Sequence, residues 1–181
     1  MNMLLRNVLF VVVLAPLVSA CISKNPATGE QNFTPFMQPE KELQIGAEEH
    51  PKMVKQFGGV YDDPKIGGYV ASIGGRLASH SERADLKFRF TVLNSPVVNA
   101  FALPGGYVYI SRGLLALANS EAELASVLGH EIGHVTARHS AQRYNKSVML
   151  GLGSAILGAA VGNRSVGQMA EMGSAIYLKS H

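Results

Sequence analysis

The strongest constraint on the fold is a run of two histidines and a glutamate with helical spacing. His130, Glu131 and His134 form the pattern His-Glu-x-x-His inside a stretch where apolar residues recur every three or four positions. Because residues four apart lie about 40° apart around a helix, both imidazoles can reach one metal ion. This pattern is typical of zinc hydrolases. The sequence therefore predicts one Zn²⁺ per chain, with His130 and His134 as ligands.

Residues ahead of this motif predict where its helix begins. Ser120 followed by Glu123 is a capping-box pattern, which marks a helix N-terminus. Apolar residues keep helical spacing from there into and through the motif, at Leu124, Val127, Leu128, Ile132 and Val135. We therefore expect one helix from about residue 120 that carries the motif.

Two histidines are too few ligands for a catalytic zinc ion. Such an ion usually takes three protein ligands and keeps one position open, so a third ligand has to come from elsewhere in the fold. Glu131 adjoins a ligand but points sideways, which suits a general base that takes a proton from water and passes it to the leaving amine. We assign Glu131 that role.

The segments before the motif predict helices followed by a small sheet. Residues 40–57 and 64–79 have helical character, and the side chains of residues 86–92 alternate between apolar and polar. Residues 97–103 and 107–111 are further strand candidates, joined by the turn signal Pro104-Gly105-Gly106. The expected fold class is α+β, mainly helical, with a small antiparallel sheet ahead of the motif helix.

One of these strands is a candidate for substrate binding. Zinc peptidases commonly bind the substrate backbone along an edge strand, and Asn99, Ala100 and Phe101 are the candidate edge. The alternative is that these residues belong to an ordinary core strand.

The N-terminus has the features of an export signal. Arg6 precedes an apolar run from Val8 to Val18 that is too short to span a bilayer, and small residues follow up to Ala20. Cys21, the sole cysteine, completes a pattern that resembles the bacterial lipobox. We expect residues 1–20 to be a lipoprotein signal peptide, Cys21 to be lipidated and residues 21–39 to be a tether. An ordinary signal peptide followed by a chance cysteine is the alternative.

Charge and composition restrict the class of partner. The formal net charge of +3 is too small for a nucleic-acid-binding surface, and the 47% of hydrophobic residues in 181 is ample for one core. We expect protein or peptide substrates and a membrane surface reached through a lipid anchor, and we expect no nucleic acid.

Two segments carry a resemblance to a known family. Residues 99–115 (NAFALPGGYVYISRGLL) and 120–139 (SEAELASVLGHEIGHVTARH) resemble the CAAX-prenyl-protease and HtpX-like zinc metallopeptidases. Within that family the chain is similar to the exported lipoprotein branch, which includes BepA-like and LoiP-like proteins. The resemblance implies a zincin-like fold and proteolysis of misfolded or misassembled proteins of the bacterial envelope. Ile22, and not Asp, follows Cys21, which resembles the outer-membrane sorting class of bacterial lipoproteins, so we expect an anchor on the periplasmic side of the outer membrane.

The resemblance also implies a glutamate on a later helix as the third ligand. The family carries it in a segment resembling Ser-Arg-x-x-Glu-x-x-Ala-Asp, and this chain has no such segment. We therefore expect residues 40–181 to be a C-terminally incomplete zinc metallopeptidase domain, with Glu171 as a weak substitute ligand. On a straight helix His139 would lie roughly 180° from His130 and 140° from His134, so it is not expected to share their ion. We expect His139 to be either a structural residue of the family or an outer partner of a ligand. The competing hypothesis is a catalytically weak or inactive lipoprotein that binds zinc or client proteins.

Overall fold

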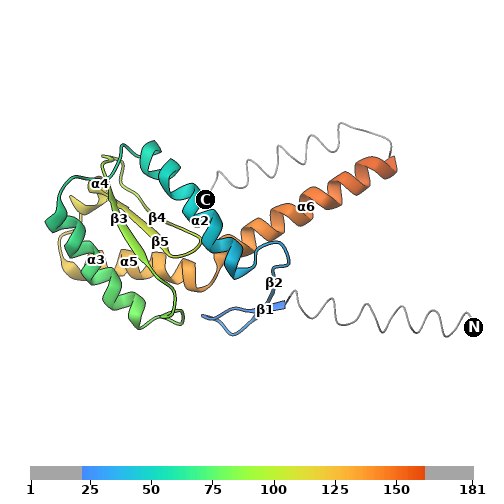
Figure 1. Ribbon diagram of the computed structural model, residues 1–181, viewed down its shortest axis with the longest axis horizontal. Helices are drawn as coiled ribbons and strands as arrows, with labels where there is room; N and C mark the ends of the chain where they lie inside the picture. Colours follow the sequence, from blue (N-terminus) through green and yellow to red (C-terminus); the bar gives the residue numbers. More distant parts are fainter. Residues whose placement is uncertain (1–21, 162–181) are drawn as a thin grey trace, which may run out of the picture. The chain divides into compact units, whose positions relative to one another are not determined.

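The computed structural model describes residues 22–161 (Figure 1). These residues divide into two compact units. The larger unit comprises residues 25–30 and 38–140. The described part of the smaller unit comprises residues 22–24, 31–37 and 141–161. The His-Glu-x-x-His motif lies in the larger unit.

Three long helices of the larger unit begin at recognisable signals. These are α2 (Pro39–Gln56), α3 (Pro64–Ser79) and α5 (Glu121–Thr136). Proline occupies the first helical position of α2 and of α3, where its missing N–H has no cost. At α3 the side chain of Asp63 also accepts hydrogen bonds from the backbone N–H groups of Lys65 and Ile66. The two helices predicted before the sheet are confirmed.

The sheet of the larger unit has three strands in the order β3-β5-β4. They are β3 (Arg89–Leu93), β4 (Ala100–Leu103) and β5 (Tyr107–Ser111), and the short helix α4 (Arg112–Leu115) follows. The turn between β4 and β5 contains Gly105 and Gly106 with φ of 80° and 88°, a conformation that glycine adopts without strain.

The sheet is mixed, and the prediction of a purely antiparallel sheet is wrong for one pair of strands. β4 and β5 pair antiparallel, as the Pro-Gly-Gly turn predicts, whereas β3 and β5 pair parallel. After the turn, β5 lies between β3 and β4. It runs opposite to β4 and in the same direction as β3. Alternating hydrophobicity identifies strands but does not give their order, so this arrangement had no local signal. The predicted fold class, mainly helical with a small sheet before the motif helix, is confirmed.

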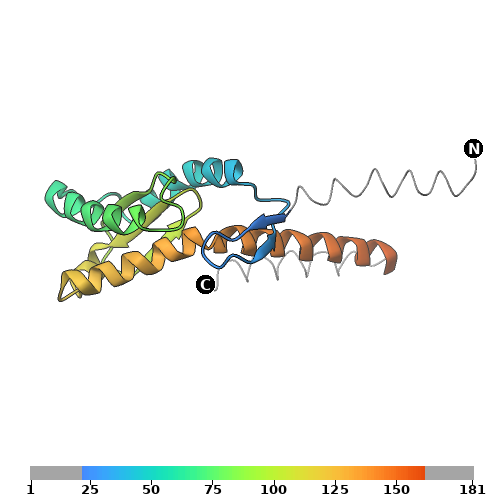
Figure 2. The same ribbon diagram turned by 90° about the horizontal axis from the view of Figure 1, so that it is seen from below.

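The central strand β5 divides the core into two layers. Val108 and Ile110 pack with residues of α3 and α5 on one face of the sheet. Tyr107 and Tyr109 point to the other face, where residues of α2 pack against them. Figure 2 shows α2 and α5 on opposite sides of the sheet. The motif helix is thus one wall of the larger hydrophobic cluster.

The smaller unit contains a hairpin and most of a long helix. β1 (Ile22–Lys24) pairs antiparallel with β2 (Gln31–Phe33), within the segment predicted as a tether. The helix α6 (His139–Val161) contributes Asn145, whose Oδ1 accepts a hydrogen bond of 2.8 Å from the Phe36 backbone N–H. Among residues 22–161, no helix is both long enough and apolar enough to cross a membrane.

Candidate metal centre

The helix that carries the motif is fixed at its N-terminus by local hydrogen bonds. The Ser120 hydroxyl accepts a hydrogen bond of 3.2 Å from the Glu123 backbone N–H, as the capping-box pattern predicts. The Glu123 carboxylate reaches one residue further back than the pattern implies, and accepts a hydrogen bond of 2.8 Å from the Asn119 backbone N–H. The first bond satisfies a backbone donor that the first turn of a helix leaves without a partner, and the second fixes the residue that precedes the N-cap.

One face of α5 is buried and holds the motif in place. Leu124, Leu128, Ile132 and Val135 are buried along this face. His130 is exposed at the surface, and Glu131 is 8% exposed. The buried face therefore orients the helix so that one histidine faces solvent while the adjacent carboxylate lies inside the protein.

The structure brings the two predicted metal ligands together. The Nε2 atoms of His130 and His134 lie 3.0 Å apart. Two nitrogen ligands of one tetrahedral zinc ion lie about 3.4 Å apart, so a small movement of the rings suffices. The residues present fit two of the ligand positions of a zinc ion.

Glu131 has the environment of a proton acceptor. Burial raises the pKa of the Glu131 carboxyl above its usual range, and the nearby His130 lowers it by a smaller amount. A carboxylate with a raised pKa is a stronger base than an exposed glutamate. Its chemistry therefore matches the predicted role of general base.

His139 lies beside the motif, because the helix on which the prediction placed it is interrupted. α5 ends at Thr136, Arg138 has a positive φ of 55°, and α6 starts at His139. The Nδ1 atom of His139 lies 2.6 Å from Nδ1 of His134. The prediction assumed one straight helix, and that assumption is wrong. His139 contacts Nδ1 of His134, whereas Nε2 of His134 faces His130.

The candidate substrate strand lies at an end of the sheet. β4 is the last strand in the order β3-β5-β4, and Ala100 pairs with Ile110 of β5. Asn99 precedes the strand and receives a hydrogen bond of 3.0 Å from the Ser111 backbone N–H. The small side chains of Ala100 and Ala102 pack against the cluster that contains Leu124 and Leu128 of α5. The position of Asn99, Ala100 and Phe101 is compatible with an edge that binds a peptide backbone, and their role stays a prediction.

The described residues do not supply a third ligand. Between residues 22 and 161, no third histidine, cysteine, aspartate or glutamate joins His130 and His134 in a group that could hold a metal ion. Glu171, the predicted substitute, and Cys21, the predicted lipidation site, lie outside the described residues.

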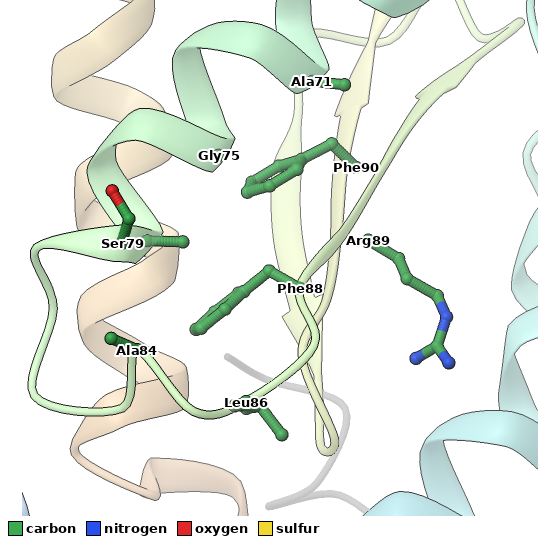
Figure 3. Close-up of a pocket in the computed structure, with 9 residues that line it drawn as sticks. Ala71, Gly75, Ser79, Ala84, Leu86, Phe88, Arg89 and Phe90 are labelled. Carbon is green, nitrogen blue, oxygen red and sulfur yellow. The ribbon is translucent and has the colours of Figure 1, made fainter.

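A hollow of about 450 Å³ lies away from the motif, between α3 and β3 (Figure 3). Phe88 and Phe90 point into it toward α3, and none of its lining residues belongs to α5. Arg89 points to the other side of the strand, where its guanidinium lies 4.7 Å from the centre of the Tyr107 ring. This hollow therefore contributes nothing to the chemistry of the histidine pair.

Three charged residues near the motif have no counterpart in the predictions. Glu42 of α2 forms ion pairs with Arg83 and Arg138, at 3.2 and 2.7 Å. Arg138 is 96 residues away from Glu42 in the chain, so no periodic pattern connects them. In the sequence Glu42 has the ordinary appearance of an acidic residue in the first turn of a helix.

Comparisons with known proteins place this geometry in context. Residues 64–180 match the pattern of peptidase family M48. The beta-barrel assembly-enhancing protease of Escherichia coli K12 is 36% identical over 102 residues, which cover 56% of this chain and 21% of that protein. A putative beta-barrel assembly-enhancing protease of Vibrio cholerae is 39% identical over 103 residues, covering 57% of this chain and 21% of the relative.

A mitochondrial relative shows a shorter match. The metalloendopeptidase OMA1 of Schizosaccharomyces pombe is 43% identical over 75 residues, which cover 41% of this chain and 22% of that protein. The chain thus spans about a fifth of the length of each of these relatives.

Proposed function

Because this chain belongs to peptidase family M48, the metallopeptidase family that its sequence predicts, we propose that it is a zinc-dependent endopeptidase of the bacterial cell envelope. Its substrates would be misfolded or misassembled envelope proteins. The strongest support for this proposal is the arrangement of three side chains on one turn of α5. The Nε2 atoms of His130 and His134 lie 3.0 Å apart, and the buried carboxylate of Glu131 adjoins them.

Each of the three motif residues would have a separate task in peptide hydrolysis. His130 and His134 would hold the zinc ion through their Nε2 atoms. When bound, zinc polarises the scissile carbonyl and makes a water molecule more acidic. Glu131 would take a proton from the attacking water and later give it to the nitrogen of the leaving amine. Burial of this carboxylate, which raises its pKa, strengthens it as the acceptor in the first of these transfers.

The sheet and the relatives support the proposed substrate class. β4 ends the sheet and packs through Ala100 and Ala102 against the cluster that includes α5. An extended peptide added along Asn99, Ala100 and Phe101 would be recognised through its backbone, which suits unfolded clients of varied sequence. The names of the two bacterial relatives refer to β-barrel assembly, which supports a role in quality control of the envelope.

The location is proposed from the N-terminal pattern. Acylation of Cys21 after removal of residues 1–20 would anchor the protein to a membrane surface, on the periplasmic side of the outer membrane. Mass spectrometry of the membrane-extracted protein should find acyl chains on Cys21. A Cys21→Ser variant that remains equally membrane-bound would contradict the anchor.

The proposed activity can be tested with a urea-denatured outer-membrane β-barrel protein as substrate. We expect the wild-type chain to cleave it, a chelator to stop cleavage and added zinc to restore it. Glu131→Gln should lower the rate by about 10²–10⁴-fold, the usual contribution of a general base. Glu121→Gln, on the exposed first turn of the same helix, is the matched control and should keep the wild-type rate.

Two results would contradict the proposal. Cleavage that survives in Glu131→Gln would contradict the role of Glu131 as general base, and cleavage that survives in excess chelator would contradict the dependence on zinc. Binding of the denatured substrate without cleavage, equal in the wild type and Glu131→Gln, would favour the client-binding lipoprotein instead.

A further inference from the structure

The break at the end of the motif helix determines where His139 lies. Arg138 adopts φ of 55°, in the left-handed region that residues other than glycine rarely occupy. An uninterrupted helix would place His139 about 140° around the axis from His134. Instead their Nδ1 atoms are 2.6 Å apart. The contact between the two imidazoles therefore depends on the backbone conformation of one residue, Arg138.

A buried ion pair stabilises that conformation. Nε of Arg138 donates a hydrogen bond of 2.7 Å to Oε1 of Glu42, and the two side chains are 6% and 4% exposed. Oε2 of the same carboxylate accepts a hydrogen bond of 3.2 Å from Nη1 of Arg83. Because an unpaired buried charge is costly, the Glu42 carboxylate strongly favours structures in which Arg138 stays in reach. This interaction offsets the steric cost of the left-handed backbone.

Glu42 is itself held at a fixed place by close packing of α2. A Cβ atom at Gly46, one turn further along α2, would collide with the carbonyl oxygen of Pro104. A Cβ atom at Gly105 would lie 3.1 Å from the carbonyl oxygen of Glu42. The first turns of α2 thus lie directly against the turn between β4 and β5, and the carboxylate has little freedom to follow a displaced Arg138.

The contact between the imidazoles has the form expected for an orienting partner of a metal ligand. A histidine that binds a metal through one nitrogen usually donates the hydrogen of the other nitrogen to a neighbour, which fixes its tautomer and ring orientation. With Nε2 of His134 directed at His130, the Nδ1–H group of His134 would donate to Nδ1 of His139. His139 would then carry its own hydrogen on Nε2.

We propose that Glu42 and Arg138 are positioning residues for the zinc site. Their ion pair holds the break between α5 and α6, the break places His139 against His134, and His139 orients His134 as a ligand. This inference rests on the proposed zinc site but adds residues that neither the motif nor its spacing indicates. It differs from a purely structural role because it connects the ion pair to metal affinity.

The two arginines that share Glu42 provide a matched test. Arg138→Gln and Arg83→Gln each remove one cationic partner of the same carboxylate, but Arg138 alone of these two belongs to the helix break. We expect Arg138→Gln, Glu42→Gln and His139→Ala to weaken zinc binding by the full chain about 10–100-fold, the usual effect of losing an outer partner of a ligand. Arg83→Gln should bind zinc as the wild type does, even if its melting temperature falls.

A measurement on the metal-free protein separates positioning from general loss of stability. Imidazole ¹⁵N–¹H spectra should show the hydrogen-bonded N–H between His134 and His139 in the wild type and in Arg83→Gln, and should lack it in Arg138→Gln. Equal zinc affinities for Arg138→Gln and Arg83→Gln, or survival of the imidazole signal in Arg138→Gln, would overturn the inference.

A glycine variant keeps the test valid if Arg138→Gln folds poorly. Arg138→Gly loses the guanidinium but adopts the left-handed conformation without steric cost, so it should bind zinc several-fold more tightly than Arg138→Gln. A glycine variant no better than the glutamine variant would contradict the proposal. If the wild-type chain binds zinc but cleaves no protein, the proposed peptidase activity fails, while the expected order of zinc affinities among the variants can still hold. If the wild-type chain cleaves protein but Arg138→Gln and Arg83→Gln bind zinc equally well, only the positioning role is rejected.

Discussion

The two ends of α5 are stabilised in opposite ways. At the N-terminus, Ser120 and Glu123 cap the helix through residues at most four positions away, and Glu121 forms an ion pair with Arg76 in which the side chains are 53% and 66% exposed. At the C-terminus, Arg138 pairs with Glu42, 96 residues distant, and both side chains are buried. The first end depends on local chemistry, and the second depends on the tertiary structure.

This difference affects function because the His-Glu-x-x-His motif lies toward the C-terminal end of α5. His134 and His139 flank the break, whereas the capping residues are two turns or more from the motif. We therefore expect substitutions at the N-terminal end to change stability alone, and substitutions at the C-terminal end to change stability and metal binding together.

The largest expected effect comes from breaking the buried ion pair. Arg138→Ala leaves the Glu42 carboxylate with one partner fewer in a buried position, which should lower the free energy of unfolding by about 3–5 kcal/mol. Arg76→Ala removes the exposed ion pair at the other end and should cost at most about 1 kcal/mol. Urea unfolding of both variants measures the two costs. Similar losses of unfolding free energy in the two variants would contradict a larger contribution from the buried ion pair than from the exposed one.

The next largest effect should come from the packing of α2, which carries Glu42 to the break. Gly46→Ala would press a methyl group onto the carbonyl oxygen of Pro104, so we expect a loss of about 1–3 kcal/mol. Gly75→Ala on α3 is the control, because no heavy atom lies within 4 Å of the added methyl group. It should stabilise the protein by up to about 1 kcal/mol through helix propensity. Thermal melting that shows no difference between the two alanines would contradict the close packing of α2.

Removal of the N-terminal cap should have a moderate effect. Ser120→Ala deletes the acceptor for the Glu123 backbone N–H and should cost about 1 kcal/mol. Ser120→Asn, which retains a capping oxygen, should recover most of that stability. Both variants should bind zinc with wild-type affinity, and isothermal titration would detect a change. A cap variant that loses zinc would show that the two ends are coupled after all.

The smallest effect concerns the acid–base balance of Glu131 in the metal-free protein. Burial raises the pKa of its carboxyl in the folded state, so folding favours the protonated form. The contribution of this carboxyl to the free energy of unfolding is therefore fully present at a pH below the ordinary pKa of glutamate. It decreases as the pH rises through the raised pKa of the folded state. Glu131→Gln should melt slightly higher than the wild type at neutral pH, with no such gain at pH 3. A lower melting temperature at pH 7 would contradict the raised pKa.

The sequence predicts those parts of the molecule whose causes are local. Asp63 and the proline after it mark the start of α3, Ser120 marks the start of α5, and Pro104-Gly105-Gly106 marks the turn between two strands. The spacing of His130 and His134 predicts that their rings meet, because a helix turn alone brings them together.

Other features have causes that are distant in the chain and could not be predicted. The insertion of β5 between β3 and β4 depends on how strands pair, which alternation does not reveal. The break at Arg138 occurs at a residue without a helix-ending signal such as glycine or proline, and the contact that stabilises it comes from α2. For this reason the position of His139 was predicted incorrectly from the geometry of a straight helix.

The roles assigned within the motif can be tested by zinc titration of the wild-type chain, Glu131→Gln and His134→Ala. We expect one zinc per chain in the wild type and an affinity that is nearly unchanged in Glu131→Gln, because Glu131 is assigned as a base and not as a ligand. His134→Ala should lose the metal to a mild chelator. Retention of zinc by His134→Ala, or equal loss from Glu131→Gln, would contradict the assignment of roles within the motif.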